Sequence, residues 1–312
     1  MAYTIAFFGT KPYDESSFND KNKEFGFEIR YYKGHLNKNN VLLTQGMDAV
    51  CIFVNDVADA EVIRVMAANG VKLLALRCAG FNNVDLNAAA AAGITVVRVP
   101  AYSPYAVAEY TVALMLSLNR KIPRASWRTK DGNFSLHGLM GFDMHGKTAG
   151  IIGTGKIAKI LIHILKGFGM NVLAYDLYPD YNFARQEQIV YTSLDELYHN
   201  SDIISLHGVM IINTGRGQLI HTNALIEGLK NKKIGSAGLD VYEEESEYFY
   251  EDQSDRIIDD DVLARLLSFN NVIVTSHQAF FTHEAMENIA ATTLQNIKDF
   301  INHKPLLNEV KK

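Results

Sequence analysis

Short apolar runs alternate with amphipathic segments along the whole chain. In the first third, near-continuous runs of β-branched, aliphatic and aromatic residues predict five strands, at 4–8, 27–32, 49–54, 73–77 and 94–99. Segments of helical composition lie between several of these strands, for example at 59–68 and 86–92. Apolar strands separated by helices are typical of a parallel sheet that helices cover on both faces.

A long helix is expected after this first set of strands. Ser103-Pro104 supplies an N-cap and a first-turn proline, and the helical pattern runs to about Lys121. The helix is apolar on most sides, so we expect it to be buried between two domains or in a subunit interface. Residues 123–145 are expected to form a long loop with Trp127 and Phe134 as apolar anchors, and such loops are usually functional or packed against a partner.

Residues 147–176 follow the order of a nucleotide-binding unit: an apolar strand, a glycine turn, an amphipathic helix, a second strand and an acid. Gly153 allows the tight turn, and Gly155 lets the backbone approach a pyrophosphate at the helix N-terminus. The glycine pattern alone is weak. The strand before it, the helix after it and an acid about 20 residues on together support dinucleotide binding. Asp176 is that acid, and a carboxylate there accepts hydrogen bonds from a ribose but repels a 2′-phosphate, which favours NAD over NADP.

Composition excludes several classes of protein. The 312 residues are 48% hydrophobic and 21% charged, which is typical of a soluble globular protein of about two domains. The net charge of −5 leaves no basic face for nucleic acid. Without a signal peptide or a membrane-spanning run, a cytoplasmic protein is expected. Cys51 and Cys78 are expected to be buried, reduced thiols, and no spacing of His, Cys and acids predicts a metal site.

One junction does not fit a parallel sheet. Strands are predicted at 202–206 and 209–213, and only His207 and Gly208 lie between them. Parallel neighbours need a crossover of about a dozen residues or more. We therefore expect that a segment between His207 and Gly208 is absent from this sequence.

Three residues that each follow a predicted strand are candidates for catalysis: Arg216, Glu245 and His277. In an open α/β sheet, the ends of the strands face the crevice in which the cofactor binds. A hydride-transfer site needs a cation for the substrate's carboxylate and carbonyl, a proton donor, and a group that keeps this donor charged. Each of the three residues alone would be read as an ion pair or a structural residue. Their joint position beside one nucleotide site supports the catalytic interpretation.

The sequence resembles the D-2-hydroxyacid dehydrogenases nearly end to end, and most of all their NAD-dependent D-lactate dehydrogenases. The runs that carry the resemblance are 77–85, 99–104, 150–158, 213–217, 240–245 and 277–280. The resemblance implies that Arg216 binds the carboxylate and carbonyl of pyruvate, that His277 is the acid/base, and that Glu245 pairs with it. It further implies that the backbone N–H groups around Ala79 and Gly80 and the Tyr102 hydroxyl hold the substrate carboxylate. Phe53 and Phe280 would then shape the pocket around the methyl group of pyruvate.

The expected cofactor contacts combine the glycine turn with positions implied by the resemblance. They are Gly153, Gly155, Lys156, Ile157, Asp176, His207, Thr214 and Asp240. The chain departs from the family at Ala158, where relatives often have Gly, and at His221, where Asp is common. Relatives also have about 20 further residues between His207 and Gly208, including a crossover helix, which agrees with the omission inferred above.

The expected architecture is two doubly wound parallel-sheet domains with an active site in the cleft between them. Residues 1–101 and 283–312 would form the smaller, flavodoxin-like substrate domain, and 102–282 the NAD-binding Rossmann domain. The expected function is reduction of pyruvate to D-lactate by a homodimer or homotetramer. The alternatives are a hydroxyisocaproate-type or glyoxylate-type enzyme, or a non-catalytic NAD-sensing protein of the same fold; a phosphoglycerate enzyme is disfavoured because no extra basic cluster is evident.

Overall fold

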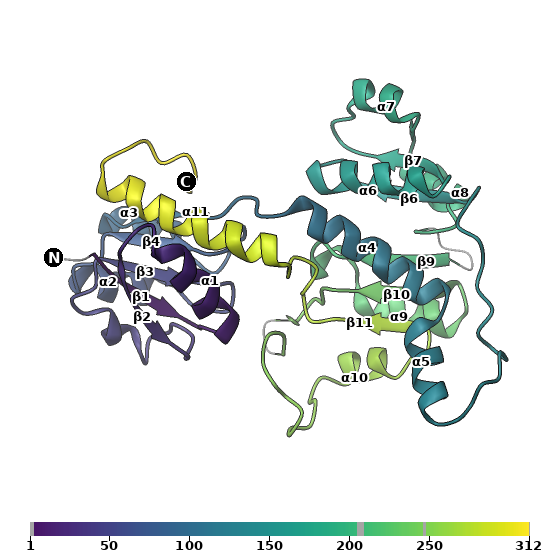
Figure 1. The fold of residues 1–312 in the computed structure, drawn as a ribbon, viewed down its shortest axis with the longest axis horizontal. Helices are drawn as coiled ribbons and strands as arrows, with labels where there is room; N and C mark the ends of the chain where they lie inside the picture. Colours follow the sequence, from purple (N-terminus) through teal and green to yellow (C-terminus); the bar gives the residue numbers. More distant parts are fainter. Residues whose placement is uncertain (1–2, 205–208, 246–247, 312) are drawn as a thin grey trace. The chain divides into compact units, whose positions relative to one another are not determined.

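The computed structural model describes residues 3–204, 209–245 and 248–311, and the chain divides into two compact units (Figure 1). Unit 1 comprises Met1–Ser103 and Phe281–Lys312, and unit 2 comprises Pro104–Phe280. Each unit contains parallel strands flanked by helices, so the expected α/β class is confirmed. The assignment of the units as substrate and NAD domains remains a prediction.

Unit 1 is built on one sheet of five parallel strands in the order β2-β1-β3-β4-β5. The strands are β1 (Thr4–Phe8), β2 (Glu28–Tyr32), β3 (Ala49–Ile52), β4 (Leu73–Leu76) and β5 (Thr95–Val97). All five predicted strands are present, and the residues of β3 and β4 are buried throughout. The chain end adds to the edge of this sheet, where Glu309 pairs antiparallel with Val97.

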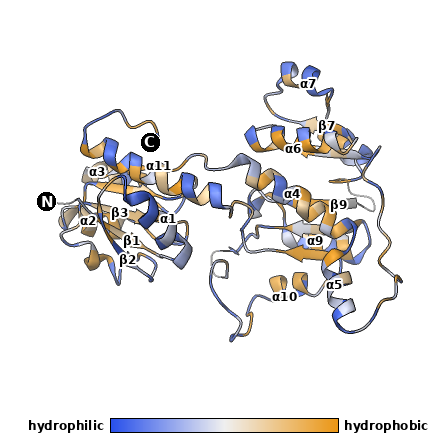
Figure 2. Cartoon of the chain, viewed as in Figure 1, coloured by the Kyte–Doolittle hydropathy of each residue, from blue (hydrophilic) through white to orange (hydrophobic). Residues whose placement is uncertain are grey.

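Helices cover both faces of the unit 1 sheet. They are α1 (Pro12–Asn22), α2 (Ala60–Ala68), α3 (Leu86–Ala92) and α11 (His283–Ile301), with a short 3₁₀ helix, η1 (Val41–Thr44). The last helix, α11, packs against α1 and β4, and α2 packs against α3 (Figure 1). Strands β1 and β3 are mainly hydrophobic, whereas α11 carries hydrophobic and hydrophilic positions together (Figure 2). This is the pattern expected for elements that bury one face on a sheet.

Unit 2 contains two three-stranded parallel sheets, ordered β6-β7-β8 and β11-β10-β9. The strands are β6 (Thr148–Ile152), β7 (Asn171–Tyr175), β8 (Val190–Tyr191), β9 (Val209–Asn213), β10 (Ile234–Leu239) and β11 (Val272–Val274). Ile203 links the two sheets, because it forms isolated parallel bridges with Ala149 of β6 and with Met210 of β9. The strands therefore present their carboxyl ends along one edge.

The helices of unit 2 pack on this sheet system. They are α4 (Pro104–Asn119), α5 (Ile122–Lys130), α6 (Lys156–Gly167), α7 (Tyr181–Glu187), α8 (Leu194–Asn200), α9 (Thr222–Lys230) and α10 (Asp261–Leu267), with the 3₁₀ helix η2 (Gly217–Leu219). Helix α4 packs against α6 and against β9, β10 and β11, while α8 packs on β6 and β7. Helix α4, which is apolar on most sides, is therefore buried by other elements of unit 2.

One local expectation was wrong, and a second was met in part. The segment expected to be a loop at 123–145 begins as a helix, α5. Trp127 and Phe134 are 69% and 76% exposed in the single chain, so their expected packing against a partner stays a prediction. The strand expected at 202–206 is reduced to the single bridging residue Ile203 in the part of the chain that is described. The omission expected between His207 and Gly208 lies outside the described residues. Among the described helices, none is long and apolar enough to span a bilayer.

Candidate active site

The glycine turn lies between β6 and α6. Gly153 has a φ of +83°, a backbone conformation that residues with a Cβ rarely adopt, and Gly155 is the N-cap of α6. A Cβ added to either glycine would meet no atom of the described chain within 4 Å, so the space over the turn is open. Lys156 and Ile157 begin α6 and are exposed. A helix N-terminus beside an open glycine turn suits a pyrophosphate, so these residues fit a bound dinucleotide.

Asp176 follows β7 and is fixed by the glycine turn. One carboxylate oxygen, Oδ2, accepts hydrogen bonds from the Thr154 amide at 2.6 Å and from the Thr154 hydroxyl at 2.8 Å. The other, Oδ1, accepts from the Tyr178 amide at 2.9 Å. These bonds, first the Tyr178 amide and then the Thr154 groups, lower the pKa of Asp176. The carboxylate is therefore negative and oriented, with lone pairs left for a ribose hydroxyl.

Thr154 holds the candidate site together, and sequence reasoning missed it. Its side chain is buried and also accepts a hydrogen bond at 2.8 Å from the hydroxyl of Tyr191 in β8. A hydroxyl residue between two glycines was the available signal. Its partners, however, lie 22 and 37 residues away in sequence and are visible only in three dimensions.

His277 and Glu245 form the pair that the sequence predicted. The imidazole Nδ1 lies 2.8 Å from Glu245 Oε1, and the two side chains are 19% and 25% exposed. The second oxygen of Glu245 accepts the Tyr242 amide at 3.0 Å, which holds the carboxylate toward the ring. Because Nδ1 faces the carboxylate, Nε2 is the ring nitrogen that can pass a proton to a substrate.

Asp240 braces the turn that carries His277. Its buried carboxylate accepts hydrogen bonds from the Thr275 hydroxyl at 2.6 Å and from the amides of Gln278 and Ala279 at 2.9 and 2.8 Å. Its carbonyl oxygen accepts the His277 amide at 2.7 Å. His277 has a φ of +52°, which is strained for a residue with a side chain. These bonds to Asp240 hold that conformation, a role that the resemblance did not supply.

Arg216 lies on the exposed loop after β9. Asn213 shapes this loop, because its side-chain oxygen accepts the Gly215 amide at 3.0 Å and its amide nitrogen donates to the Arg216 carbonyl at 2.9 Å. A Cβ on Gly217 would lie only 2.0 Å from the carbonyl oxygen of Tyr242. The Arg216 loop therefore touches the backbone that leads to Glu245.

The remaining predicted residues have structural partners within their own units. In unit 2, the Thr214 hydroxyl lies 2.8 Å from the Thr111 hydroxyl, and Phe280 is 8% exposed. In unit 1, the carbonyls of Ala79 and Gly80 accept from the Arg98 guanidinium at 2.8 Å and the Cys78 thiol at 3.3 Å. The carbonyl of Tyr102 accepts from the Asn288 amide at 2.9 Å, and Phe53 lies against Arg77. His207 lies outside the described residues.

The described chain has no group of three His, Cys, Asp or Glu side chains arranged to hold a metal ion. The groups present are an imidazole in contact with a carboxylate, an arginine on the neighbouring loop and a glycine turn of the nucleotide-binding type. Such a set suits proton-coupled transfer at a carbonyl beside a carboxylate.

Comparison with known proteins gives a consistent result. The family profile described as "D-isomer specific 2-hydroxyacid dehydrogenase, catalytic domain" matches residues 5–311. D-lactate dehydrogenase of Escherichia coli is 48% identical to this chain over 327 positions, which cover 98% of the chain and 99% of the relative. Because 327 positions exceed the 312 residues of the chain, at least 15 aligned positions have no counterpart here.

Solved structures agree with this match. The structure reported as the pyruvate reductase of Chlamydomonas reinhardtii superposes with a TM-score of 0.94 at 40% identity, covering 98% of each chain. The NAD-complexed D-isomer specific 2-hydroxyacid dehydrogenase of Lactobacillus delbrueckii ssp. bulgaricus gives a TM-score of 0.81 at 27% identity, covering 99% of this chain and 100% of that chain.

Proposed function

Because the chain belongs to the D-isomer specific 2-hydroxyacid dehydrogenases, and is therefore an oxidoreductase, we propose that it is an NAD-dependent D-lactate dehydrogenase. The reaction is the reversible reduction of pyruvate to D-lactate. The observation that carries the proposal is the contact of His277 Nδ1 with the Glu245 carboxylate at 2.8 Å, on a turn that Asp240 holds in place. The relatives named as a D-lactate dehydrogenase and as a pyruvate reductase support the choice of substrate.

Each polar group has a role in this proposal. The planar guanidinium of Arg216 grips the substrate carboxylate and polarises the neighbouring carbonyl. His277, through Nε2, gives a proton to the carbonyl oxygen as it becomes a hydroxyl, and takes it back in the reverse direction. Glu245 stabilises the charged imidazole and fixes its orientation. NAD, when bound, supplies the nicotinamide that exchanges a hydride with the substrate carbon.

The cofactor would be held by the glycine turn and by Asp176. The amides at the start of α6, together with the exposed Lys156, suit the pyrophosphate, and the oriented Asp176 carboxylate suits the ribose hydroxyls. A carboxylate that remains charged repels the 2′-phosphate of NADP. Contacts from Ile157, Thr214 and Asp240 remain predictions. The L. delbrueckii relative binds NAD, which supports NAD for this chain.

The substrate roles of Phe53, Ala79, Gly80 and Tyr102 in unit 1, and of Phe280 in unit 2, are part of the same proposal. A homodimer or homotetramer and a cytoplasmic location are also proposed. Exposed apolar side chains in α5 and the segment after it suit a contact with a second copy of the chain: Trp127, Phe134, Leu136 and Met140.

A turnover assay with a panel of 2-oxo acids tests the proposal. With NADH, the highest kcat/KM is expected for pyruvate, and NADPH should support far less turnover. A higher kcat/KM for glyoxylate or for 2-oxoisocaproate would replace pyruvate as the preferred substrate while leaving the family assignment unchanged. Nicotinamide binding without turnover on any 2-oxo acid would contradict an enzymatic role.

A further inference from the structure

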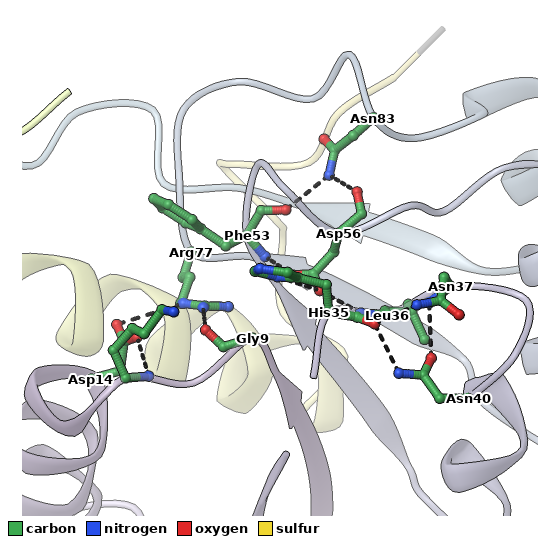
Figure 3. A network of polar contacts seen from close by, with 11 residues as sticks. Gly9, Asp14, His35, Leu36, Asn37, Asn40, Phe53, Asp56, Arg77 and Asn83 are labelled. Atoms are coloured by element: carbon green, nitrogen blue, oxygen red, sulfur yellow. Dashed lines mark hydrogen bonds and ion pairs between the residues drawn. The ribbon is translucent and has the colours of Figure 1, made fainter. Parts of the chain in front are cut away.

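A buried arginine contacts the ring of Phe53 in unit 1 (Figure 3). Arg77 follows β4 and is 3% exposed. Its Nη2 donates to the Gly9 carbonyl at 2.9 Å, and its Nε lies 3.6 Å from Asp14 Oδ1. Its Nη1 is buried and has no hydrogen-bond partner among the described residues. A buried donor without a partner is unfavourable, so hydrogen bonding alone does not explain why the Arg77 guanidinium is buried here.

The contacts of the guanidinium with aromatic rings supply the explanation. Burial alone would lower the pKa of Arg77, but the nearby acids, Asp14 first, raise it, so the group is a cation. Its Cζ lies 4.4 Å from the ring centroid of Phe7 and 5.0 Å from that of Phe53. A guanidinium at these distances attracts a ring face, and the attraction is larger where water is excluded. Phe7 is fully buried, so Arg77 connects the rigid core to Phe53.

The backbone of Phe53 is held separately from its ring. The Phe53 amide donates to Asp56 Oδ2 at 2.6 Å. The side-chain amide of Asn83 donates to the carbonyls of both Phe53 and Asp56 at 2.8 Å (Figure 3). The other oxygen of Asp56 accepts the Leu36 amide at 2.6 Å. With the backbone fixed in this way, the ring position of Phe53 depends on its side-chain contacts, which are packing against the unit 1 core and the contact with the Arg77 guanidinium.

We propose that Arg77 is a positioning residue that holds the ring of Phe53 and thereby sets the length of 2-oxo acid side chain that the enzyme accepts. The inference rests on the proposed function, in which Phe53 shapes the pocket around the methyl group of pyruvate. Arg77 itself is buried behind Phe53 and acts through that ring. Loosening Phe53 makes room for extra methylene groups, and one methylene changes discrimination by roughly tenfold or more in a fitted pocket.

The test compares pyruvate with 2-oxobutyrate and 2-oxopentanoate in wild type and in Arg77→Lys. Lysine keeps the charge beside Asp14 but has no planar face to stack on the ring. We expect the ratio of kcat/KM for 2-oxopentanoate to that for pyruvate to rise about fivefold, in the same direction as in Phe53→Leu. The matched control is Arg64→Lys on the exposed surface of α2, which should leave the ratio unchanged.

A second variant leaves Arg77 intact. Pentafluorophenylalanine at position 53 keeps the shape of the ring but reverses its quadrupole, which removes the attraction to a cation. The same rise in the ratio is expected. Fluorine NMR of 4-fluorophenylalanine at position 53 reads the ring directly, and its resonance should shift and broaden in Arg77→Lys but not in Arg64→Lys.

The outcomes separate the two proposals. A parallel fall in kcat/KM for all three substrates with an unchanged ratio would mean that Arg77 has only a structural role. If the wild-type protein reduced no 2-oxo acid, the proposed function would fail. The fluorine resonance alone would then decide whether Arg77 positions the Phe53 ring. A resonance that is identical with and without the Arg77 guanidinium would then overturn the positioning role, and a changed resonance would support it.

Discussion

Replacing Gly217 with Ala tests the contact between the Arg216 loop and the Glu245 loop. The added Cβ would lie 2.0 Å from the Tyr242 carbonyl oxygen, and real Cβ contacts essentially never fall below 3.0 Å. The two backbone segments must therefore separate by at least about 1 Å. A misplacement of about 1 Å can lower the rate about 10²-fold, which corresponds to about 2.7 kcal/mol of transition-state stabilisation.

The assay is steady-state reduction of pyruvate with NADH, together with NADH binding measured by its fluorescence. We expect kcat/KM for pyruvate to fall about 10²-fold in Gly217→Ala, while the Kd for NADH changes much less, because Asp176 and the glycine turn are not displaced. Gly215→Ala in the same loop is the matched comparison, since its Cβ would make only ordinary contacts at 3.4 and 3.5 Å. A folded Gly217→Ala variant with kcat/KM within about threefold of wild type would refute the reasoning.

Three further predictions follow from the site and the sheet. Asp176→Ala should narrow the preference for NADH over NADPH. Because the pKa of Asp176 is lowered, its carboxylate stays charged until the pH falls below the usual pKa of an aspartate, so in wild type the preference for NADH should persist at mildly acidic pH. Equal kcat/KM with NADH and NADPH in wild type would contradict the assignment. In Glu245→Gln, kcat for pyruvate reduction should fall at least about tenfold, because a carboxamide 2.8 Å from His277 cannot stabilise a charged imidazole as a carboxylate does, and an unchanged kcat would remove Glu245 from the mechanism. Intact-mass spectrometry should give a mass about 2 kDa above the 34.8 kDa of the sequence. The reason is that Ile203 and Met210 pair in parallel, whereas parallel neighbours need a crossover of about a dozen residues or more between them. A mass of 34.8 kDa would show that no crossover segment is missing.

The strands were predictable because burial on both faces leaves a plain signal in the sequence. The apolar runs at Thr4–Phe8 and Ala49–Ile52 are strands of the unit 1 sheet, and the strand-turn-helix order around Gly153 is observed. Helix α5 was missed for the opposite reason. It is only nine residues long and has no buried residue, so its few apolar side chains do not mark a helix that packs on the core.

The site was predictable where a residue follows a strand and carries its own chemistry. His277 and Glu245 are such residues, and the structure brings them together. The groups that brace the site were not predictable. Thr154 and Asn213 act through hydrogen bonds whose geometry depends on how distant or tightly turned segments meet, and a threonine or asparagine in a loop is too common to stand out.

The most direct test of the central claim is the chirality of the product formed from pyruvate and NADH. The lactate made by the purified protein is separated on a chiral column while NADH oxidation is followed at the same time. The account predicts one mole of D-lactate for each mole of NADH oxidised, and loss of this product in His277→Ala. Formation of L-lactate, or no oxidation of NADH with pyruvate, would contradict it.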